Sequence, residues 1–159
     1  VSSPENLKNK DISEINTSCI AKGDTGASHH YWMTKDDKIL KNLTEIKGPK
    51  VQLPNNEVIT ATVAGELPLS EHLSPTARKA MVLPKLKSSN LISIGQLCDD
   101  GCDVRFTKRF VIVTKNNQTI MKGKRNFRNG MYEINFKDIL LDKNRLQPQL
   151  NQAINNSNL

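Results

Sequence analysis

The chain has 159 residues, of which 36% are hydrophobic, 4% aromatic and 25% charged, and its formal net charge is +7 at pH 7. This length predicts one domain with extensions and excludes two full-sized lobes. The composition excludes a collagen-like fibre and, with only three cysteines, a disulfide scaffold, and no apolar run approaches the roughly 20 residues that span a bilayer.

Both ends of the chain are polar. Residues 1–15 show little periodicity and no secretory signal, which predicts a flexible segment. Because the first residue is Val1, we expect a processed product or an excised piece of a longer chain. Residues 141–159 are rich in Asn and Gln, which predicts a disordered tail. Between the ends we expect a core at 16–106 and a basic, β-rich extension at 107–140.

Short β-leaning runs separated by turn residues fill the middle of the chain. Pro54-Asn55-Asn56 predicts the turn of a hairpin, because Asn tolerates positive φ. The segment 91–98 changes from an apolar strand to a short helix, and Asp99-Asp100-Gly101 ends it. We expect strands at 18–21, 50–53, 57–63, 80–83, 103–106, 110–114, 118–122 and 131–135.

Two further turns are indicated by Lys115-Asn116-Asn117 and Arg128-Asn129-Gly130. Many short strands with little helix predict an all-β fold. We expect a small closed barrel with a hairpin flap, one short helix and a β-rich C-terminal extension.

One motif carries catalytic chemistry: Asp24-Thr25-Gly26-Ala27-Ser28, which follows an apolar run. An aspartic protease needs an aspartate on a tight turn beside a second carboxylate. Like charges about 3 Å apart cannot both ionise, so the pair holds one proton and a water molecule. Gly26 allows close backbone approach, Thr25 can bridge the pair, and Ala27 is small enough to lie under the turn. The tripeptide Asp-Thr-Gly alone also occurs in ordinary turns.

Two other segments support this interpretation. The hairpin of residues 51–63 can cover a cleft as a flap, because flaps exclude water and hold extended substrates. The apolar run 91–95 can pack beneath the catalytic turn. The expected flap residues are Leu53, Pro54, Asn55, Asn56, Glu57 and Val58, and the expected turn-packing residues are Ile92, Ile94 and Gly95.

With these segments in order, the chain resembles the retropepsin-like protease of Ty/copia-type retrotransposon polyproteins. The resemblance covers roughly residues 18–136, the last part of which, 107–136 with GKRNFRNGMYEI, looks like part of the pre-integrase region that follows the protease. The matching segments are DTGASHH at 24–30, VQLPNNEVITATVAGELPL at 51–69, MVLP at 81–84 and NLISIGQLCDDGCDVRF at 90–106.

The resemblance implies a retropepsin fold that works as a homodimer on a Gag-Pol-type polyprotein or peptide substrate. The sequence agrees, because one Asp-Thr-Gly triplet supplies one carboxylate and two copies related by a twofold axis supply a pair. Asp24 of each subunit would act as general base and general acid, and the flap would hold the peptide by strand addition. We expect no cofactor, no metal and no membrane partner, and an intracellular, cytoplasmic location, within virus-like particles where these form.

The residues before the catalytic aspartate depart from the family pattern. Lys22 and Gly23 stand where apolar residues are usual, and Lys22 shares a strand face with Asp24. A weakly active or inactive retropepsin-like domain that serves dimerisation or assembly is therefore an alternative. The flap tip also carries Asn55-Asn56 where relatives often carry Gly.

Other candidate sites have less support. A nucleophilic pair of Ser28 and His30 lacks a third member, so we expect His29 and His30 as polar residues near the surface. Tyr31 and Trp32 are expected as partial core. Cys98-x3-Cys102 matches no compact zinc pattern, and the three cysteines, Cys19 included, are expected as reduced thiols.

The excess positive charge belongs to one segment. Residues 1–103 have a net charge of −1, whereas 104–137 carry nine basic residues against Glu133 alone. A nucleic-acid-binding module centred on 104–137 is thus a further alternative, with weak nonspecific contact to RNA or DNA. The basic residues are Arg105, Lys108, Arg109, Lys115, Lys122, Lys124, Arg125, Arg128 and Lys137.

Overall fold

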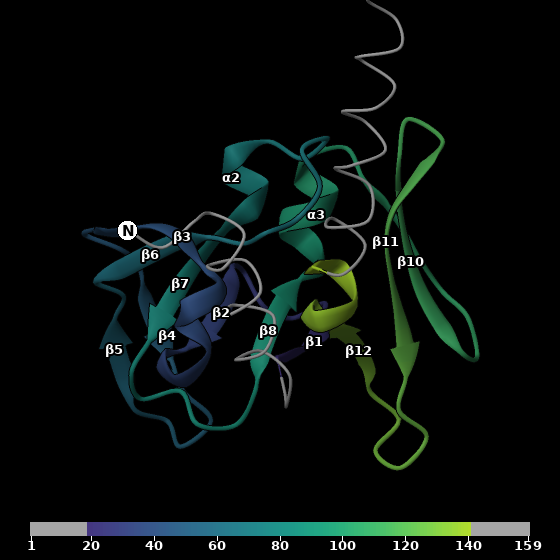
Figure 1. The fold of residues 1–159 in the computed structure, drawn as a ribbon. Coiled ribbons are helices and arrows are strands. Elements are labelled where there is room, and N and C mark those ends of the chain that lie inside the picture. Colours follow the sequence, from purple (N-terminus) through teal and green to yellow (C-terminus); the bar gives the residue numbers. More distant parts are fainter. Residues whose placement is uncertain (1–18, 141–159) are drawn as a thin grey trace, which may run out of the picture. The chain divides into compact units, whose positions relative to one another are not determined.

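The computed structural model describes residues 19–140 of the chain (Figure 1). The segments predicted as a flexible start, 1–15, and a disordered tail, 141–159, lie outside the described residues. The chain divides into two units. One comprises Ile20–Ile134, and the other combines the two ends, of which Cys19 and residues 135–140 are described. In the second unit residues 136–140 are helical, and the Phe136 N–H donates to the Cys19 carbonyl at 2.9 Å.

Strands dominate the described residues, which confirms the all-β class. Ten strands form one sheet in the order β3-β6-β7-β2-β8-β1-β12-β11-β10-β9, and β4 and β5 form a separate pair. The strands are β1 (Ile20–Asp24), β2 (His30–Met33), β3 (Lys41–Glu45), β4 (Lys50–Gln52), β5 (Val58–Thr60), β6 (Val63–Glu66), β7 (Lys79–Leu83), β8 (Asn90–Ser93), β9 (Asp103–Phe106), β10 (Phe110–Lys115), β11 (Gln118–Arg125) and β12 (Tyr132–Asn135).

The sheet differs from the expected closed barrel. Within the described residues, β3 and β9 end the strand order and do not pair with each other, so the sheet is open. The structure also has more helix than the one predicted segment. Besides the helical residues 136–140, the described helices are the 3-10 helix η1 (Thr34–Ile39) and the α-helices α2 (Pro75–Arg78) and α3 (Ile94–Asp99), and no described helix is long and apolar enough to cross a membrane.

Local sequence explains which elements were predicted. The strand-to-helix change at β8 and α3 is confirmed, and Ser93 caps α3 by accepting the Gln96 N–H at 3.0 Å. Helix α2 was missed although Ser74 and Pro75 are a capping signal in the sequence. Strand β3 was missed because all its residues are exposed and Asn42 interrupts it with a φ of 54°.

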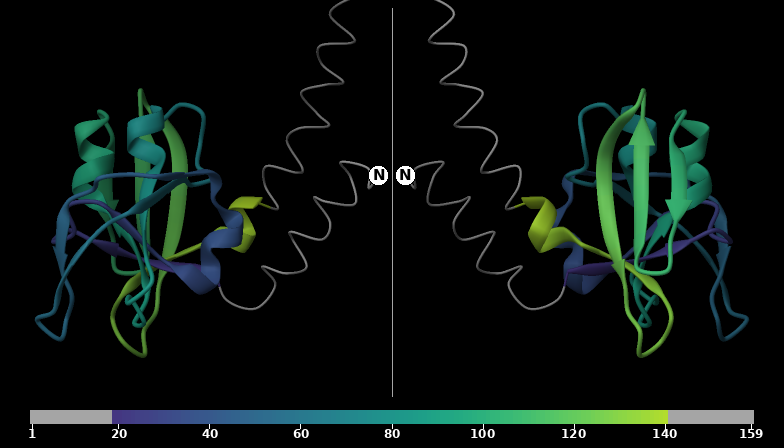
Figure 2. Two further views of the ribbon diagram at one scale, coloured as in Figure 1. Left: turned by 90° about the vertical axis from the view of Figure 1, so that its left-hand side faces the viewer. Right: turned by 90° about the vertical axis from the view of Figure 1, so that its right-hand side faces the viewer.

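The C-terminal strands follow their predicted turns closely. Asn116 and Asn117 have φ values of 51° and 62°, as a two-residue hairpin turn between β10 and β11 requires. Strand β10 pairs antiparallel with both β9 and β11, and Figure 2 shows β10 and β11 in green as a twisted ribbon. Gly123 in β11 cannot carry a side chain, because a Cβ there would lie 2.4 Å from the Glu133 carbonyl oxygen.

A polar cluster around Asp100 connects three elements. Its carboxylate accepts the Ser74 hydroxyl at 2.6 Å and the Ser74 N–H at 3.0 Å, which fixes the start of α2. The Lys115 ammonium at the end of β10 donates to the same carboxylate at 2.9 Å. The Ser74 hydrogen bonds, followed by the Lys115 hydrogen bond and charge, lower the pKa of Asp100 to about 2.

We expect Asp100→Asn to lower the free energy of unfolding by about 1–3 kcal/mol at neutral pH, because it removes a charged acceptor from Ser74 and Lys115. Because the carboxyl pKa is 3.8 without these partners and about 2 in the fold, its contribution is present above pH 3.8 and is lost as the pH falls toward 2. Urea unfolding at several pH values measures both effects. The exposed neighbour Asp99→Asn is the control, and an equal loss in both variants would contradict the prediction.

Candidate active site

Asp24 is the last residue of β1 and begins the tight turn that leads to β2. Its Oδ1 accepts the Gly26 N–H at 2.7 Å, which holds the carboxylate over the turn. A Cβ at position 26 would lie 3.3 Å from that oxygen, so glycine leaves room for the approach. Thr25 and Gly26 are exposed, whereas Ala27 is buried as predicted.

Strand β8 runs parallel to β1 and supports the turn. Asp24 is paired with Ser93 in the strand register, and the Ser93 hydroxyl donates to the Ala27 carbonyl at 2.6 Å. Ile92 and Ile94 are buried here, and a Cβ at Gly23 would touch Ile94 Cδ1 at 3.4 Å. The segment 91–95 thus lies next to the Asp24 turn. Its last member, Gly95, is instead exposed in α3.

His30 is the residue that the sequence interpretation placed wrongly. It was expected near the surface, but its side chain is fully buried at the start of β2. Its Nδ1 accepts the Ser93 N–H at 2.9 Å, and its Nε2 lies 2.7 Å from the Ala77 carbonyl, to which it donates. Its backbone N–H donates to Gln96 Oε1 at 2.8 Å. His30 therefore fixes the strand that supports the Asp24 turn.

This burial also keeps the His30 ring neutral. Desolvation lowers the pKa of His30 to about 4, against an ordinary value of 6.5, although the hydrogen bond to Ala77 acts in the opposite direction. A carbonyl acceptor on one ring nitrogen and an N–H donor on the other suit the neutral imidazole.

The pair of Ser28 and His30 that was considered as a nucleophilic site does not form. His30 turns into the core, and Ser28 Oγ instead lies 3.1 Å from His29 Nδ1 and 3.0 Å from the Tyr31 hydroxyl. Tyr31 and Trp32 are both buried, more fully than the expected partial core.

The predicted flap hairpin is present as β4 and β5, paired in antiparallel register with Val51 opposite Ile59. Its turn is closed by the Leu53 N–H donating to Glu57 O at 2.8 Å and the Asn56 N–H donating to Leu53 O at 2.9 Å. Asn56 has a φ of 68°, a backbone conformation that glycine adopts in many turns. Pro54, Asn55 and Val58 are exposed with the rest of the tip.

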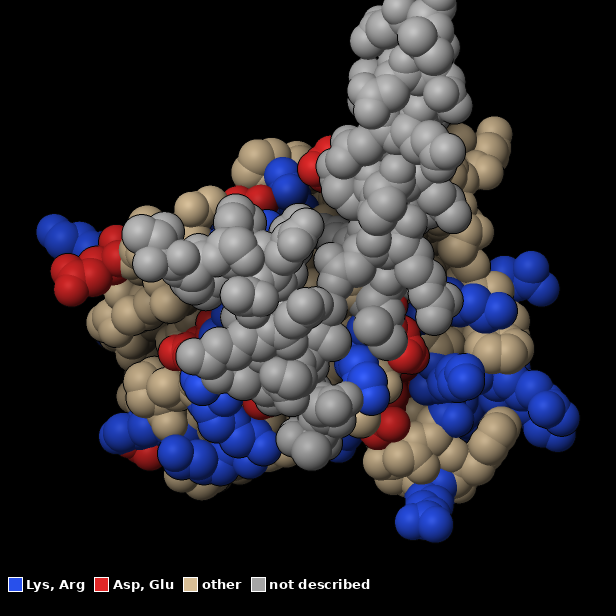
Figure 3. All heavy atoms as spheres, in the orientation of Figure 1, with Lys and Arg blue, Asp and Glu red and all other residues tan. Residues whose placement is uncertain are grey.

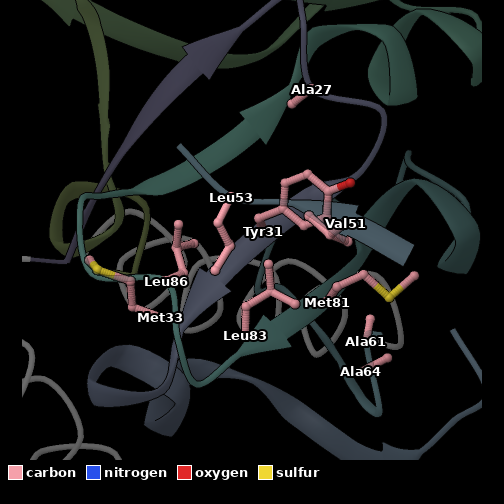
Figure 4. Packing of buried hydrophobic residues seen from close by; sticks show 10 residues of the cluster. All are labelled: Ala27, Tyr31, Met33, Val51, Leu53, Ala61, Ala64, Met81, Leu83 and Leu86. Atoms are coloured by element: carbon pink, nitrogen blue, oxygen red, sulfur yellow. The ribbon is translucent and has the colours of Figure 1, made fainter. Parts of the chain in front are cut away.

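The side chains of the hairpin reach the Asp24 turn. Val51 and Leu53 are buried in one apolar cluster with Ala27 from the turn and Tyr31 from β2 (Figure 4). Strand β7 contributes Met81 and Leu83, and the other members are Met33, Ala61, Ala64 and Leu86. At the tip, Glu57 forms an ion pair with Lys85, which lies after β7.

The remaining candidate groups are dispersed. Within residues 19–140, no group of three or more His, Cys, Asp or Glu side chains is placed to hold a metal ion. Cys19 and Cys102 are buried, Cys98 is exposed, and all three are free thiols. Lys22 is half-buried in β1, two residues before Asp24.

Comparison with known protein families gives one match. Residues 23–102 match the family described as Pol polyprotein, beta-barrel domain. The matched span begins one residue before Asp24 and includes the flap hairpin, β8 and α3. No curated protein and no solved structure matches the chain.

We expect the free energy of unfolding to fall as the pH drops from about 6.5 to about 4. In this range His30 is protonated in the unfolded chain but stays neutral in the folded one, so protonation favours unfolding. His30→Gln should remove this pH dependence and lower the free energy of unfolding at pH 7 by about 2–3 kcal/mol, since Ser93 and Ala77 lose their partners. Chemical unfolding between pH 4 and pH 7 measures both. His29→Gln is the matched control and should retain the pH dependence.

Proposed function

The chain belongs to the Pol polyprotein beta-barrel domain family and is thus a component of a retroelement polyprotein, and from this we propose that it is a retropepsin-like aspartic endopeptidase that processes such a polyprotein as a homodimer. The observation that carries the proposal is the geometry of Asp24. Its carboxylate stands on a tight turn, held by the Gly26 N–H and supported from below by Ser93.

The proposed chemistry needs a second carboxylate. The chain contains one Asp-Thr-Gly triplet, at 24–26, and Thr25 and Gly26 are exposed. A second copy placed by a twofold axis would bring its own Asp24 beside the first, and the two carboxylates would share one proton. One would remove a proton from water as the water attacks the peptide carbonyl. The other would protonate that carbonyl oxygen, and the leaving amine would then receive a proton as the C–N bond breaks.

The flap hairpin supplies the substrate cover in this proposal. Its inward side chains, Val51 and Leu53, are already part of the cluster that contains Ala27, so the hairpin is anchored next to the catalytic turn. Its tip is exposed, so an extended peptide could lie against it. The expected substrate is therefore an extended segment of the polyprotein.

Lys22 favours the competing function, a weakly active or inactive domain that serves dimerisation or assembly. It is half-buried on the strand that ends at Asp24, and a positive charge there favours two ionised carboxylates over a shared proton. A folded, dimeric domain in a precursor that does not cut itself would support this alternative and contradict the protease.

We expect Asp24→Asn to reduce cleavage of a longer precursor by roughly 10³-fold or more, because the amide cannot act as general base. Mass spectrometry of the fragments measures cleavage, and thermal unfolding should show the fold unchanged. Asp99→Asn makes the same chemical change on the exposed end of α3 and should cleave normally. Equal activity of the Asp24 variant and the original chain would exclude the assignment.

Mixing the two forms tests the dimer. If the active site contains Asp24 from both subunits, an equilibrated equal mixture of active chain and Asp24→Asn should keep about one quarter of the activity, at fixed total concentration, because only one pairing in four is intact. A site made by one chain alone would keep about one half. Sedimentation of the same mixtures reports whether dimers form.

A further inference from the structure

The C-terminal strands carry a surface that the proposed protease chemistry does not use. Because Arg105, Ile112 and Lys122 are aligned across β9, β10 and β11, their side chains lie on one face of the sheet. Phe110 and Lys124 form the next row of the same face. This face is opposite to the one that buries Val111, Val113 and Met121.

More basic residues lie at one end of these strands. The turn from β9 to β10 contains Lys108 and Arg109, and the loop from β11 to β12 contains Phe127 and Arg128. The two connections are neighbours, because the Arg125 N–H donates to the Arg109 carbonyl at 2.8 Å. We call these two rows and two connections the basic sheet surface, comprising Arg105, Lys108, Arg109, Phe110, Ile112, Lys122, Lys124, Phe127 and Arg128.

In the described part of the chain, no ion pair involves the positive charges of this surface. The ion pairs found within residues 19–140 lie elsewhere, at Glu66, Glu57 and Asp100. The Lys122 ammonium lies over the Phe110 ring at 4.0 Å from its centroid, in contact with an aromatic face. Two acids border the surface: Glu133 opposite Lys124 in the strand register, and Asp103 at the far end of β9.

The charge is also local. Residues 19–103 contain ten basic and ten acidic side chains, so the rest of the described domain is balanced. In the space-filling view, Lys and Arg gather on the side of the molecule formed by β10 and β11, and a second group lies at the lower left (Figure 3). A surface of this kind attracts a polyanion more strongly than a protein partner of mixed charge.

Aromatic rings stand beside the charges. Phe127 is 65% exposed at the loop tip, and Phe110 lies in the second row of the surface beneath the Lys122 ammonium, whereas Phe106 pairs with Val111 and belongs to the opposite face. Exposed rings next to cations can stack on unpaired bases, which a duplex does not present. Phosphate contacts and base stacking together are typical of proteins that bind single strands without sequence preference.

We propose that the basic sheet surface binds single-stranded nucleic acid, with Arg105, Lys122 and Lys124 on phosphates and Phe127 stacked on a base. The partner chemistry is a flexible polyphosphate strand with exposed bases. This function is independent of the catalytic turn, because β9–β11 lie at one end of the strand order, separated from β1 by β12. In a polyprotein component, such a surface would hold the proposed protease on an RNA strand.

The test measures binding of a fluorescent strand of about 20 uridines by anisotropy at increasing salt. The triple variant Arg105→Gln, Lys122→Gln, Lys124→Gln should bind at least about tenfold more weakly at about 50 mM salt, and its log–log salt slope should be shallower by about 2. The slope distinguishes lost phosphate contacts from a general loss of stability, which thermal unfolding checks separately.

A second triple variant removes the same charge elsewhere: Lys41→Gln, Lys47→Gln, Lys87→Gln, all exposed outside the surface. It should bind within about twofold of the original chain at about 50 mM salt. Equal weakening by both triples would overturn the proposal, because net charge alone would then explain the binding. Absence of binding by the original chain at low salt would overturn it as well.

Phe127→Ala should weaken binding by about five- to a hundredfold if the ring stacks on a base. Leu43→Ala, another exposed apolar residue, should have no effect. Thymidine strands of the same length should bind like the uridine strands, since stacking and phosphate contacts use no 2′-hydroxyl. Tighter binding to a duplex or to anionic lipid vesicles than to the single strand would contradict the proposal. None of these measurements depends on proteolysis, so they remain decisive even if the protease proposal fails.

Discussion

The buried His30 side chain is the contact on which the rest of the domain depends. Its ring receives the Ser93 N–H and donates to the Ala77 carbonyl, so one side chain connects β2, β8 and α2. Ser93 in turn restrains the Asp24 turn, because its hydroxyl donates to the Ala27 carbonyl. Burying an imidazole without hydrogen-bond partners would lower the free energy of unfolding, so the fold requires both partners of the ring. The position of Asp24 is thus set by hydrogen bonds that come from residues about 70 positions later in the chain.

The proposed catalytic and binding functions occupy different parts of one sheet. The half around β1, β2 and β8 is balanced in charge and buries the apolar cluster beneath the flap. The half formed by β9–β11 buries one face and exposes a row of cations on the other. A negatively charged partner is therefore attracted mainly to the β9–β11 end of the sheet, away from Asp24.

Local patterns predicted much of this fold. The flap turn, the Asn116-Asn117 turn and the change from β8 to α3 each depend on neighbours in the sequence, and each is confirmed. The burial of His30 depends instead on Ala77 and Ser93, which no local window contains. The strand order also depends on distant residues, because β2 lies between β7 and β8, which come much later in the sequence. The placement of β8 beside the Asp24 turn agrees with the expectation that the apolar run 91–95 packs beneath that turn. The activity of Asp24 remains a prediction.

The flap is the distal half of a longer arm. Hydrogen bonds from the Ile46 N–H to Thr62 O and from the Gly48 N–H to Ala61 O continue the ladder from β3–β6 into β4–β5. A Cβ at Gly48 would lie 2.6 Å from the Ala61 carbonyl oxygen, so the two chains are in close contact there. Within the described residues, no strand pairing joins β4 or β5 to the larger sheet. Lifting the arm therefore exposes the side chains of Val51 and Leu53 but breaks no ladder between sheets. The burial of these two side chains and the Glu57–Lys85 ion pair are therefore the contacts that hold the hairpin against the domain.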